Sequence, residues 1–405
     1  MRLLRVLIFA VIAMSVSLVA QTDTGHYYMM SFFKTNFPGT GDFTGGFFAL
    51  STDGINWVEL NDGNSPTIPG SSLGEKRVRD PYLYYDAPNH MFRYVYTTGW
   101  LDTIMGYSQI TVANGKDFKN FQNWDQLDAQ GSRQVPIADK IPNATCTWAP
   151  EIFWDDIQNK YMIYWSTEIG LQGKRGYYIL TSDFKTFTNP EKFFDPGFAE
   201  IDGDMLKVSN NLYYFFFKDE RPDSQRVYYV TATNPQGKDA QGAVGKGWSP
   251  ISAKPITSLQ GCEGPSSIKI GNEYRVYFDP YAARQNYRMV KSTDLITWQD
   301  GKTINQVIGS TSSSIYYSHC NVIEIPKNVY DWVLTAKLSV RLNPTISTPK
   351  YLGANRFQEP GTYSVSGKKL SSRYSWSNKN TAQSLPNGFF ITVDKTKKVG
   401  SLLQE

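Results

Sequence analysis

The stretch RVRDPYLYYD (77–86) decides the fold, because an acid and a proline stand directly before an alternating aromatic segment. Side chains of a strand alternate between its two faces, so Tyr82 and Tyr84 share a face with Asp80 while the intervening residues point the other way. We therefore predict a buried strand with an acid at its mouth.

This layout returns at four later positions, each a strand that opens with a polar or acidic group: WAPEIFWD (148–155), IDGDMLKV (201–208), CEGPSSIKI (262–270) and HCNVIEI (319–325). A turn motif, with Asp three or four residues before an aromatic, recurs in TDGINW (52–57), KDFKNF (116–121), SDFKTF (182–187) and STDLITW (292–298), with a degenerate copy at ATNPQG before Trp248. One unit about every 60 residues is typical of propeller blades rather than helical solenoids.

Second and third apolar strands follow each of the first four copies, and the mature chain has no clear helical periodicity. We predict an all-β fold, a five-bladed β-propeller in which the first strand of each blade faces the central axis. N- and C-terminal strands share the fifth blade: 319–325 supplies its inner strand, and YYMMSFF (27–33) and GGFFALSTD (45–53) supply outer strands. The strand-like VYDWVLTAK (329–337) competes for one of these places.

The two ends of the chain differ from the repeats. Residues 1–20 predict a secretory signal peptide, with Arg2 and Arg5 before an apolar run and Ala20 at the cleavage point, so secretion is expected. A membrane anchor is disfavoured, since the run is barely long enough and no basic cluster follows. We assign 21–339 to the propeller and 340–405 to a C-terminal extension packed on it.

Composition limits the classes of partner. Without Arg2 and Arg5 the net positive charge is small, which argues against nucleic acid or an anionic membrane surface as partner. The three cysteines exclude a disulfide scaffold and show no metal-ligand spacing. Buried filling residues are the simpler interpretation, and a bridge between Cys262 and Cys320 stays open.

The first residues of the repeated strands are expected to converge at the axis. They are Asp80, Trp148 with Glu151, Asp202 with Asp204, Glu263 and His319. Crowded acids raise one another's pKa, and three acids at equivalent positions of different repeats indicate acid and base chemistry. Cleavage of a glycosidic bond needs such a pair of carboxyl groups.

WAPEIFWD followed by KYMIYWST, with DPYLYYD upstream and IDGDM and CEGPSSIKI downstream, resembles glycoside hydrolase family 43 over nearly the whole mature chain. The resemblance implies a five-bladed propeller and an inverting mechanism. It assigns Asp80 as general base, Asp202 as the acid that orients and tunes the proton donor, and Glu263 as general acid. Asp204 is the alternative to Asp202, because we expect the two to share a strand face.

The resemblance also makes His319 the axial histidine beneath the site, with a structural calcium ion expected near it and no cofactor required. Trp148 and Trp100 are candidates for stacking on sugar, or for filling space between blades, and Glu151 is interpreted as structural. The expected substrates are arabinofuranosides, xylosides or galactofuranosides of oligo- and polysaccharides. Inversion predicts Asp80 and Glu263 carboxyl groups about 6.5 to 9.5 Å apart.

Two other functions compete. Retaining hydrolases of fructan and sucrose also carry RDP and a Glu beside a Cys, but no Asn-Asp-Pro-Asn-Gly stretch precedes Asp80 here. A carbohydrate-binding propeller without turnover is the non-enzymatic alternative, and retention of three acids argues against it.

Overall fold

The computed structural model describes residues 25–36, 41–42, 45–60, 78–89, 91–97, 109–117, 133–136, 140–184, 186–283, 287–301, 305–306, 315–342, 361–363, 369–371, 389–393 and 401–404. The chain divides into two compact units, Met1–Thr335 and Ala336–Glu405. Residues 1–20 and Trp100, for which a signal peptide and a sugar contact were predicted, lie outside the described residues.

Four sheets of the first unit are built from strands that follow one another in the chain. The first contains β5 (Arg79–Asp86), β6 (Met91–Thr97), β7 (Gln109–Asp117) and β8 (Arg133–Pro136), and the second β9 (Trp148–Asp155), β10 (Lys160–Glu168), β11 (Lys174–Thr181) and β12 (Glu191–Phe194). The third contains β13 (Glu200–Ser209), β14 (Leu212–Asp219) and β15 (Val227–Ala232), and the fourth β16 (Glu263–Ile270), β17 (Glu273–Asp279), β18 (Arg288–Ser292) and β19 (Gln299–Asp300). The predicted first strands therefore coincide with β5, β9, β13 and β16 to within two residues.

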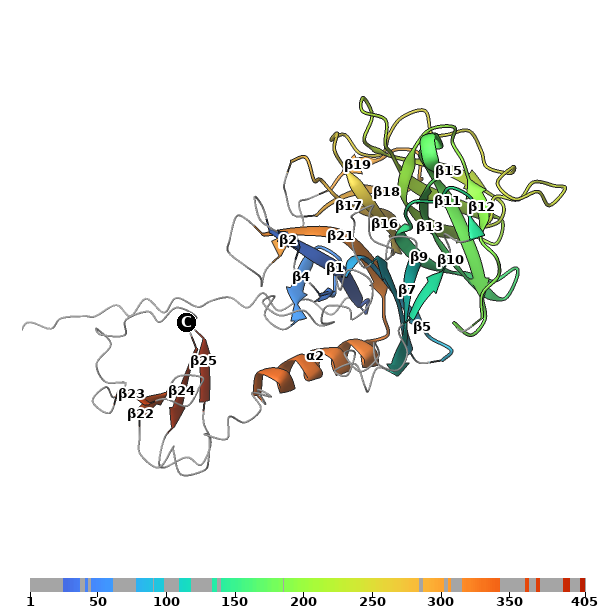
Figure 1. Cartoon of the computed structure of the whole chain (residues 1–405). Coiled ribbons are helices and arrows are strands. Elements are labelled where there is room, and N and C mark those ends of the chain that lie inside the picture. The colour runs from blue at the N-terminus through green and yellow to red at the C-terminus, as the bar shows by residue number, and fades with distance from the viewer. Residues whose placement is uncertain are drawn as a thin grey trace, which may run out of the picture. The chain divides into compact units, whose positions relative to one another are not determined.

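A fifth sheet joins segments from the two ends of the first unit. Its strands are β21 (Ile315–Glu324), β1 (Tyr28–Asn36), β3 (Phe47–Ser51) and β4 (Asn56–Glu59), with β2 (Gly41–Asp42) and β20 (Asn305–Gln306) at its margins. Antiparallel pairing sets Tyr28 opposite Glu324, so β1 and β21 lie side by side, blue beside orange in Figure 1. The predicted sharing of one sheet between early and late strands is confirmed.

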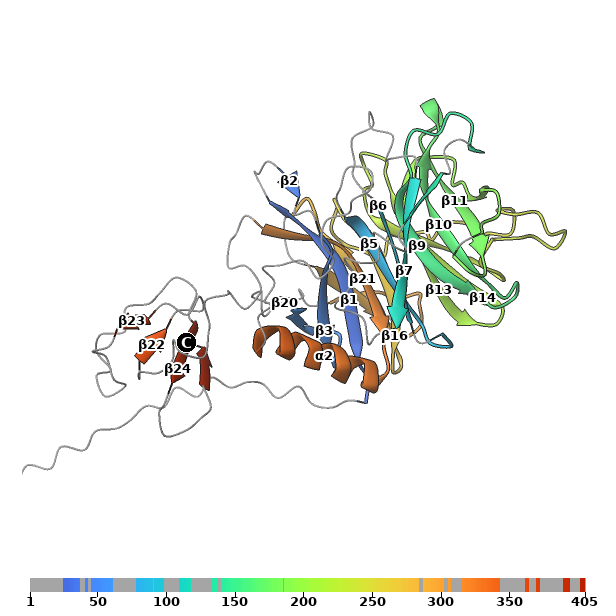
Figure 2. The ribbon, with the colours of Figure 1, turned by 60° about the horizontal axis from the view of Figure 1, so that its bottom comes forward.

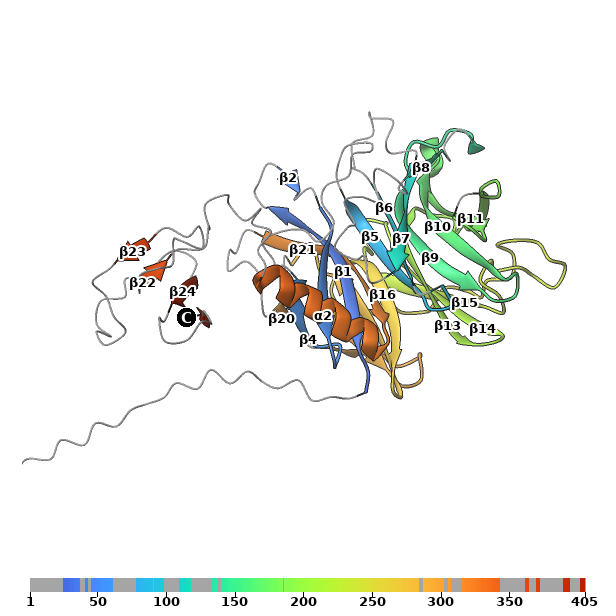
Figure 3. The ribbon, with the colours of Figure 1, turned by 90° about the horizontal axis from the view of Figure 1, so that it is seen from below.

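The segment 329–337 is helical, which corrects the strand-like interpretation and the statement that the chain lacks helical periodicity. It belongs to α2 (Lys327–Leu342), whose first turn begins with Val329 and Tyr330 donating to the Pro326 carbonyl. Val329 and Val333, four residues apart on one helix face, are buried against apolar side chains of β1 and β3. Figure 3 shows α2 lying across the strands of the fifth sheet.

The first strands of the five sheets contact one another in a cyclic order. Strand β5 contacts β9, β9 contacts β13, β13 contacts β16, β16 contacts β21, and β21 contacts β5 again. Figure 2 shows β16, β21, β1 and β5 next to one another. An apolar cluster that mixes aliphatic and aromatic side chains lies between each neighbouring pair of sheets, the first and fifth included. The high aromatic content therefore fills the spaces between sheets.

Hydrogen bonds join neighbouring sheets at their first strands, where a side chain of one sheet accepts a backbone N–H from the first strand of the next sheet. Three of the accepting side chains lie on first strands, and the fourth, Tyr164, lies on β10. The bonds run from Leu83 N to Asn321 Oδ1 (2.7 Å), Val322 N to Ser266 Oγ (2.9 Å), Ser267 N to Asp204 Oδ2 (3.0 Å) and Met205 N to Tyr164 Oη (3.0 Å). Tyr164 in turn donates to Glu151, the residue of β9 that corresponds to Asp204. Polar residues just inside the strand starts thus connect the sheets.

The repeated Asp motif forms the turn between third and fourth strands. Asp53 Oδ1 accepts the backbone N–H groups of Ile55 and Asn56, each at 2.8 Å, and Asp294 Oδ1 accepts those of Ile296 and Thr297. Such side-chain bonds to nearby amides favour a tight turn. The sequence signal therefore located the turns correctly in the described copies.

The remaining features concern the second unit and the cysteines. A four-stranded sheet forms in the second unit from β22 (Gly361–Tyr363), β23 (Lys369–Ser371), β24 (Phe389–Val393) and β25 (Ser401–Gln404). Cys146, Cys262 and Cys320 are buried thiols, as the filling interpretation predicted. None of the described helices is long and apolar enough to cross a membrane.

Candidate active site

An extra residue interrupts the pairing of every first strand with its neighbour. It lies close to the start of β5, β9, β13 and β16 but in the middle of β21, which begins at Ile315 rather than at the predicted His319. This bulge places one residue of each strand in the left-handed region. These residues are Asp80 (φ 46°), Ala149 (φ 49°), Asp202 (φ 58°), Gly264 (φ 58°) and His319 (φ 49°). Bulges redirect side chains and are frequent beside active sites.

The bulges define which residues of the repeats are equivalent. Asp80, Asp202 and His319 occupy the same position, whereas Glu263 lies one residue before its equivalent, Gly264. The expectation that all three acids are equivalent is therefore wrong for Glu263. The expected two-residue alternation also fails here, because the extra residue shifts the register between Arg79 and Tyr82.

Proline was the sequence signal for these bulges. Pro81, Pro150 and Pro265 each follow a left-handed residue directly. Proline cannot donate to a ladder, so within sheets it is confined to edges, strand starts and bulges. The Asp-Pro, Ala-Pro and Gly-Pro pairs of the repeats mark where the regular ladder is interrupted.

Asp80 and Asp202 converge on the ring of His319. The Nδ1 atom of His319 lies 3.5 Å from Asp80 Oδ1 and 3.8 Å from Asp202 Oδ2. The side chain of Asp80 is 15% exposed, whereas those of Asp202 and His319 are buried. The predicted base therefore reaches solvent, and His319 lies behind the two acids.

Asp202 connects this pair to the strand that carries Glu263. Its Oδ2 atom accepts the backbone N–H of Gly264 at 3.0 Å. Burial raises the pKa of Asp202 to about 7, with Glu263 and Asp80 adding to the increase and His319 and Lys218 opposing it. A Cβ atom on Gly264 would lie 3.2 Å from His319 Cγ, so glycine allows both the close approach and the left-handed backbone.

Asp204 has a different environment from Asp202. Its Oδ2 atom accepts the backbone N–H and the hydroxyl of Ser267, and burial raises its pKa to about 7. Asp204 thus holds β16 to β13, while Asp202 faces His319. Of the two alternatives predicted for the tuning acid, Asp202 is therefore the one that lies beside His319 and the Gly264 amide.

Glu263 has a lysine beside it that sequence reasoning missed. Lys218 Nζ lies 2.9 Å from Glu263 Oε2 and 2.7 Å from Glu220 Oε1. The side chain of Glu263 is 30% exposed and that of Lys218 is 5% exposed. A basic residue at the end of the apolar run LYYFFFKD was the available signal, since lysine is rarely buried without an acidic partner.

A second residue missed from the sequence is Asp279, paired with Glu263 in the β16–β17 ladder. Its buried carboxyl group accepts hydrogen bonds from the backbone of His319 and the side chain of Ser318. Burial raises its pKa well above the usual value, and the nearby Glu263 adds to this effect. Asp279 therefore fixes the bulge that carries His319.

The second sheet contributes no acid at its bulge, where Ala149 stands. Trp148, predicted to stack on sugar, is half-buried, and Lys174 Nζ lies 4.9 Å from the centroid of its ring. Glu151 is buried beneath the bulge and bonds to Tyr164, in keeping with a structural role.

Metal binding near His319 was also expected. Within the described ranges, no three His, Cys, Asp or Glu side chains are grouped so that they could hold a metal ion. The calcium ion near His319 therefore stays a prediction.

Comparison with known proteins places this site in a family. The sequence profile of a "probable glycosyl hydrolase domain", related to family 43, matches residues 23–331. This chain belongs to that family of glycosyl hydrolases. The match includes all five first strands, and therefore Asp80, Asp202 and Glu263 of this family 43-related domain.

Individual relatives are more distant. An alpha-L-arabinofuranosidase of Bifidobacterium longum subsp. longum is 27% identical over 213 residues, covering 44% of this chain. The match spans only 19% of the length of that relative. The crystal structure of an alpha-L-arabinofuranosidase from Lactobacillus brevis is 16% identical, covering 60% of this chain and 76% of that one, with a TM-score of 0.41. A thermostable family-43 glycoside hydrolase covers the same shares at 14% identity and a TM-score of 0.41.

Proposed function

We propose that this family 43-related domain hydrolyses O-glycosidic bonds with inversion at the anomeric carbon, and that its substrates are arabinofuranosides. One observation carries the proposal: Asp80, Asp202 and Glu263, from three different sheets, are brought together around His319 and Gly264. Family membership supplies the reaction class, and the arrangement of acids supports their roles.

The proposal includes a closed five-bladed propeller as the scaffold. The cyclic contacts of β5, β9, β13, β16 and β21 support closure, as do the apolar clusters between all five neighbouring pairs of sheets. In a propeller the first strands line the axis, so residues at their starts share one end of a central funnel.

In the proposed mechanism Glu263 protonates the glycosidic oxygen while Asp80 removes a proton from an attacking water molecule. Inversion requires these groups on opposite faces of the sugar, with room for the water between Asp80 and the anomeric carbon. Asp202 supports Glu263 through the Gly264 amide and through its charge. Its pKa of about 7 lets that charge change within the working pH range of a neutral enzyme.

Substrate choice is inferred from a relative. The match to an alpha-L-arabinofuranosidase favours arabinofuranosides over the xylosides and galactofuranosides that the sequence left open. We further propose that the enzyme is secreted, on the strength of the apolar run in residues 1–20.

Hydrolysis of 4-nitrophenyl α-L-arabinofuranoside tests the proposal, with the matching β-xyloside and β-galactofuranoside beside it. Proton NMR of the first-formed sugar should show the inverted anomer. Asp80→Asn and Glu263→Gln should each lower kcat by about 10²- to 10⁴-fold, the usual contribution of a general acid or base.

A matched control is Asp156→Asn, since Asp156 forms an exposed ion pair with Lys207 outside the site. It should leave kcat unchanged. Retention of configuration would favour the fructan-type mechanism instead. Binding of arabinose-containing oligosaccharides without hydrolysis of any substrate would favour the non-catalytic alternative.

A further inference from the structure

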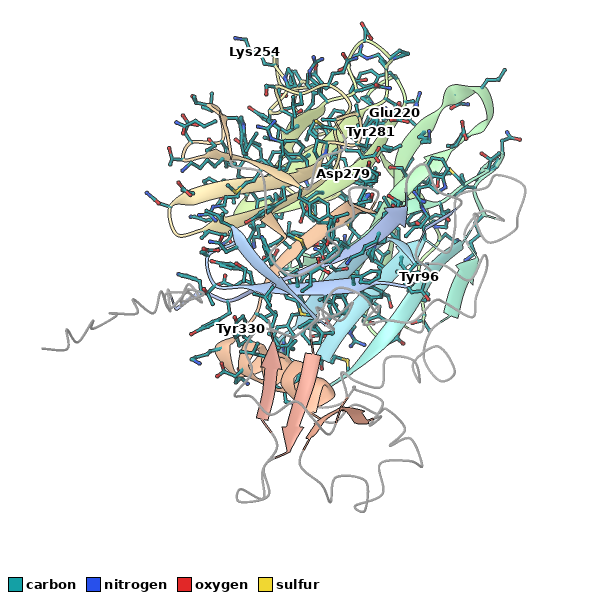
Figure 4. The ribbon with its side chains drawn as sticks, turned by 90° about the vertical axis from the view of Figure 1, so that its left-hand side faces the viewer. Tyr96, Glu220, Lys254, Asp279, Tyr281 and Tyr330 are labelled. Carbon is teal, nitrogen blue, oxygen red and sulfur yellow. The ribbon has the colours of Figure 1, made fainter. Side chains whose placement is uncertain are left out.

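Lys218 is a buried lysine on β14 that contacts Glu263, whereas the residues at the same position in the first and fourth sheets bind backbone amides. Its amino group contacts both Glu263 and Glu220, and it lies 4.5 Å from the centroid of the Tyr281 ring. Glu220 also accepts Lys174 Nζ, at 3.3 Å. Figure 4 labels Glu220, Tyr281 and Asp279, which mark this part of the molecule.

Lys218 carries its proton throughout the working range. Burial lowers its pKa, but the attraction of Glu263, Glu220 and Asp202 outweighs burial, and the net effect is a rise. Burial likewise raises the pKa of Glu220, and Lys218 and Lys174 more than offset this, so the net effect is a decrease. A positive charge therefore lies between two carboxyl groups, one of them the proposed proton donor.

The repeat explains why a lysine can stand there. Lys218 is the second-strand residue opposite the bulge, the position held by Thr97 in the first sheet and Asp279 in the fourth. Thr97 Oγ1 accepts the bulge amide of Ala149 at 3.3 Å, and Asp279 accepts that of His319. Each of these two side chains anchors the bulge of the following sheet.

In the third sheet the residue that anchors the next bulge is Asp202, on the first strand, and not Lys218 on the second. The corresponding bulge amide, that of Gly264, donates to Asp202 instead of to the second strand. Lys218 is thereby available to bind the side chain one position earlier, which is Glu263. Because Asp202 accepts the Gly264 amide, Lys218 can contact Glu263, and Asp202 lies next to the residue that follows Glu263.

We propose that Lys218 is a positioning residue for the general acid, and that it stabilises the carboxylate of Glu263 as this forms in the transition state. The inference rests on the proposed function. As the glycosidic bond breaks, the proton of Glu263 passes to the leaving oxygen, the bonding electrons go to that oxygen, and Glu263 becomes negative beside the Lys218 ammonium group. Lys218 keeps its own proton throughout. Because the Lys218 ammonium group contacts the Glu263 carboxylate as its negative charge develops, it stabilises the transition state more than the ground state.

Several other charged or titratable groups lie around Glu263. They are Asp202 on β13, Glu220 after β14, Asp279 on β17, Tyr281 after β17, and His319 and Asp80 beyond Asp202. Lys218 is the cation in direct contact, and Glu220 lies on the other side of it. Removing Lys218 and removing the charge of Glu220 should therefore act in opposite directions on the proton of Glu263.

The test compares pH–rate profiles of the full-length enzyme and four variants on 4-nitrophenyl α-L-arabinofuranoside. Lys218→Met should lower kcat by about 10²-fold with KM within about threefold, and should move the alkaline limb of kcat/KM up by about one pH unit. Lys218→Arg keeps the charge and should restore kcat at least tenfold over Lys218→Met. Glu220→Gln should move the same limb downward, a pattern that loss of packing alone does not produce. Lys207→Met, which breaks the exposed pair with Asp156, is the matched control and should behave as wild type.

If the wild-type enzyme is active but the pH–rate profiles of Lys218→Met and Glu220→Gln do not shift, the role of Lys218 is overturned. The proposed function is not affected by that result. An inactive wild-type enzyme on every glycoside tested would overturn the proposed function and this inference with it. Should Lys218→Met fail to fold, Lys218→Arg and Glu220→Gln still decide the matter, through retained activity and the downward shift respectively.

Discussion

Asp202 and Asp204 stand two residues apart on β13, both buried, yet they bond to different parts of β16. Asp202 accepts the Gly264 amide beside Glu263 and faces His319, whereas Asp204 holds Ser267 further along β16. Their separation by a bulge gives each residue its own environment.

Asp202→Asn should therefore lower kcat by about 10²-fold while the melting temperature changes little, because asparagine retains an acceptor for the Gly264 amide. Asp204→Asn should leave kcat of the folded enzyme within a few-fold and reduce stability by about 1–3 kcal/mol through weakened bonds to Ser267. Steady-state kinetics and urea unfolding of both variants separate the two effects. The reverse pattern would identify Asp204 as the tuning acid.

At the residue scale, sequence reasoning found the candidate acids but not their mutual geometry. Asp80, Asp202 and His319 could be selected because they open repeated strands, and the bulges place them at equivalent positions. Lys218 and Asp279 were not selected from the sequence. Asp279 is the last residue of a second strand and Lys218 the last but one, where a polar residue is interpreted as a solvent-exposed strand end unless the neighbouring sheet is known.

The element scale is governed by the contacts between first strands. Asn321 on β21 accepts the Leu83 amide of β5 and so links the fifth sheet to the first. This contact joins residues 238 positions apart in the chain. A long-range contact of this kind acts on the stability of the whole sheet arrangement.

Asn321→Ala should destabilise the protein by about 1–3 kcal/mol, since the buried Leu83 amide loses its acceptor. Chemical denaturation monitored by tryptophan fluorescence provides the measurement. Asn211→Ala is the matched control, because Asn211 is exposed in the hairpin between β13 and β14. Equal stability of the two variants would show that the link to Leu83 contributes nothing.

Elements were predicted best where two signals coincided. The first strands combined an opening polar residue with aromatic alternation, and the Asp turns combined a capping acid with a following aromatic. The helix α2 was missed because its apolar residues include adjacent pairs such as Val329–Tyr330 and Val333–Leu334, which read equally as a short buried strand. The fact that decides against a strand is the pairing within the fifth sheet, where β1, β3 and β4 already occupy the places for which 329–337 competed.

Across the whole molecule, buried acids make stability depend on pH. Burial raises the pKa of Glu200 well above its usual value of 4.5, and neither of its carboxyl oxygens has a hydrogen-bond partner among the described residues. The folded state therefore binds the proton more tightly than the unfolded state. Stability from this group is complete below about pH 4.5 and falls as pH rises toward the folded pKa.

Glu200→Gln keeps the shape and removes the titration, so it should raise stability at pH 8 by about 1–2 kcal/mol and change it little at pH 4.5. Melting temperatures of variant and wild type across this pH range test the expectation. A difference that is independent of pH would contradict it. Glu191→Gln, at an exposed site on β12, is the control.

The cysteines allow another test of the whole molecule. Cys146, Cys262 and Cys320 are buried thiols, so a thiol reagent such as DTNB should react with none of them in the native protein and with all three in guanidinium. A reducing agent should leave the melting temperature unchanged. Only one reactive thiol in the denatured protein would reveal a Cys–Cys bridge.

Sequence periodicity indicated the repeat number because strand starts and turns recur at similar spacing. The order of contacts among sheets could not be read from the repeats, since it depends on which apolar faces meet, as Phe215 does with Phe193 and Phe194. The proposed division at residue 339 lies close to the boundary after Thr335, and the sheet of β22 to β25 was visible in advance only through GFFITVDK (388–395).

The left-handed bulges place acids needed for the proposed activity in a backbone conformation that lowers stability. Asp80 and Asp202 occupy a backbone conformation that costs of order 1 kcal/mol for most residues with a side chain and almost nothing for glycine, which Gly264 provides at the equivalent place. Selection for robustness alone would drive these positions toward glycine and extinguish the proposed chemistry. A single Asp→Gly substitution at either acid would thus give a more stable protein without the proposed activity.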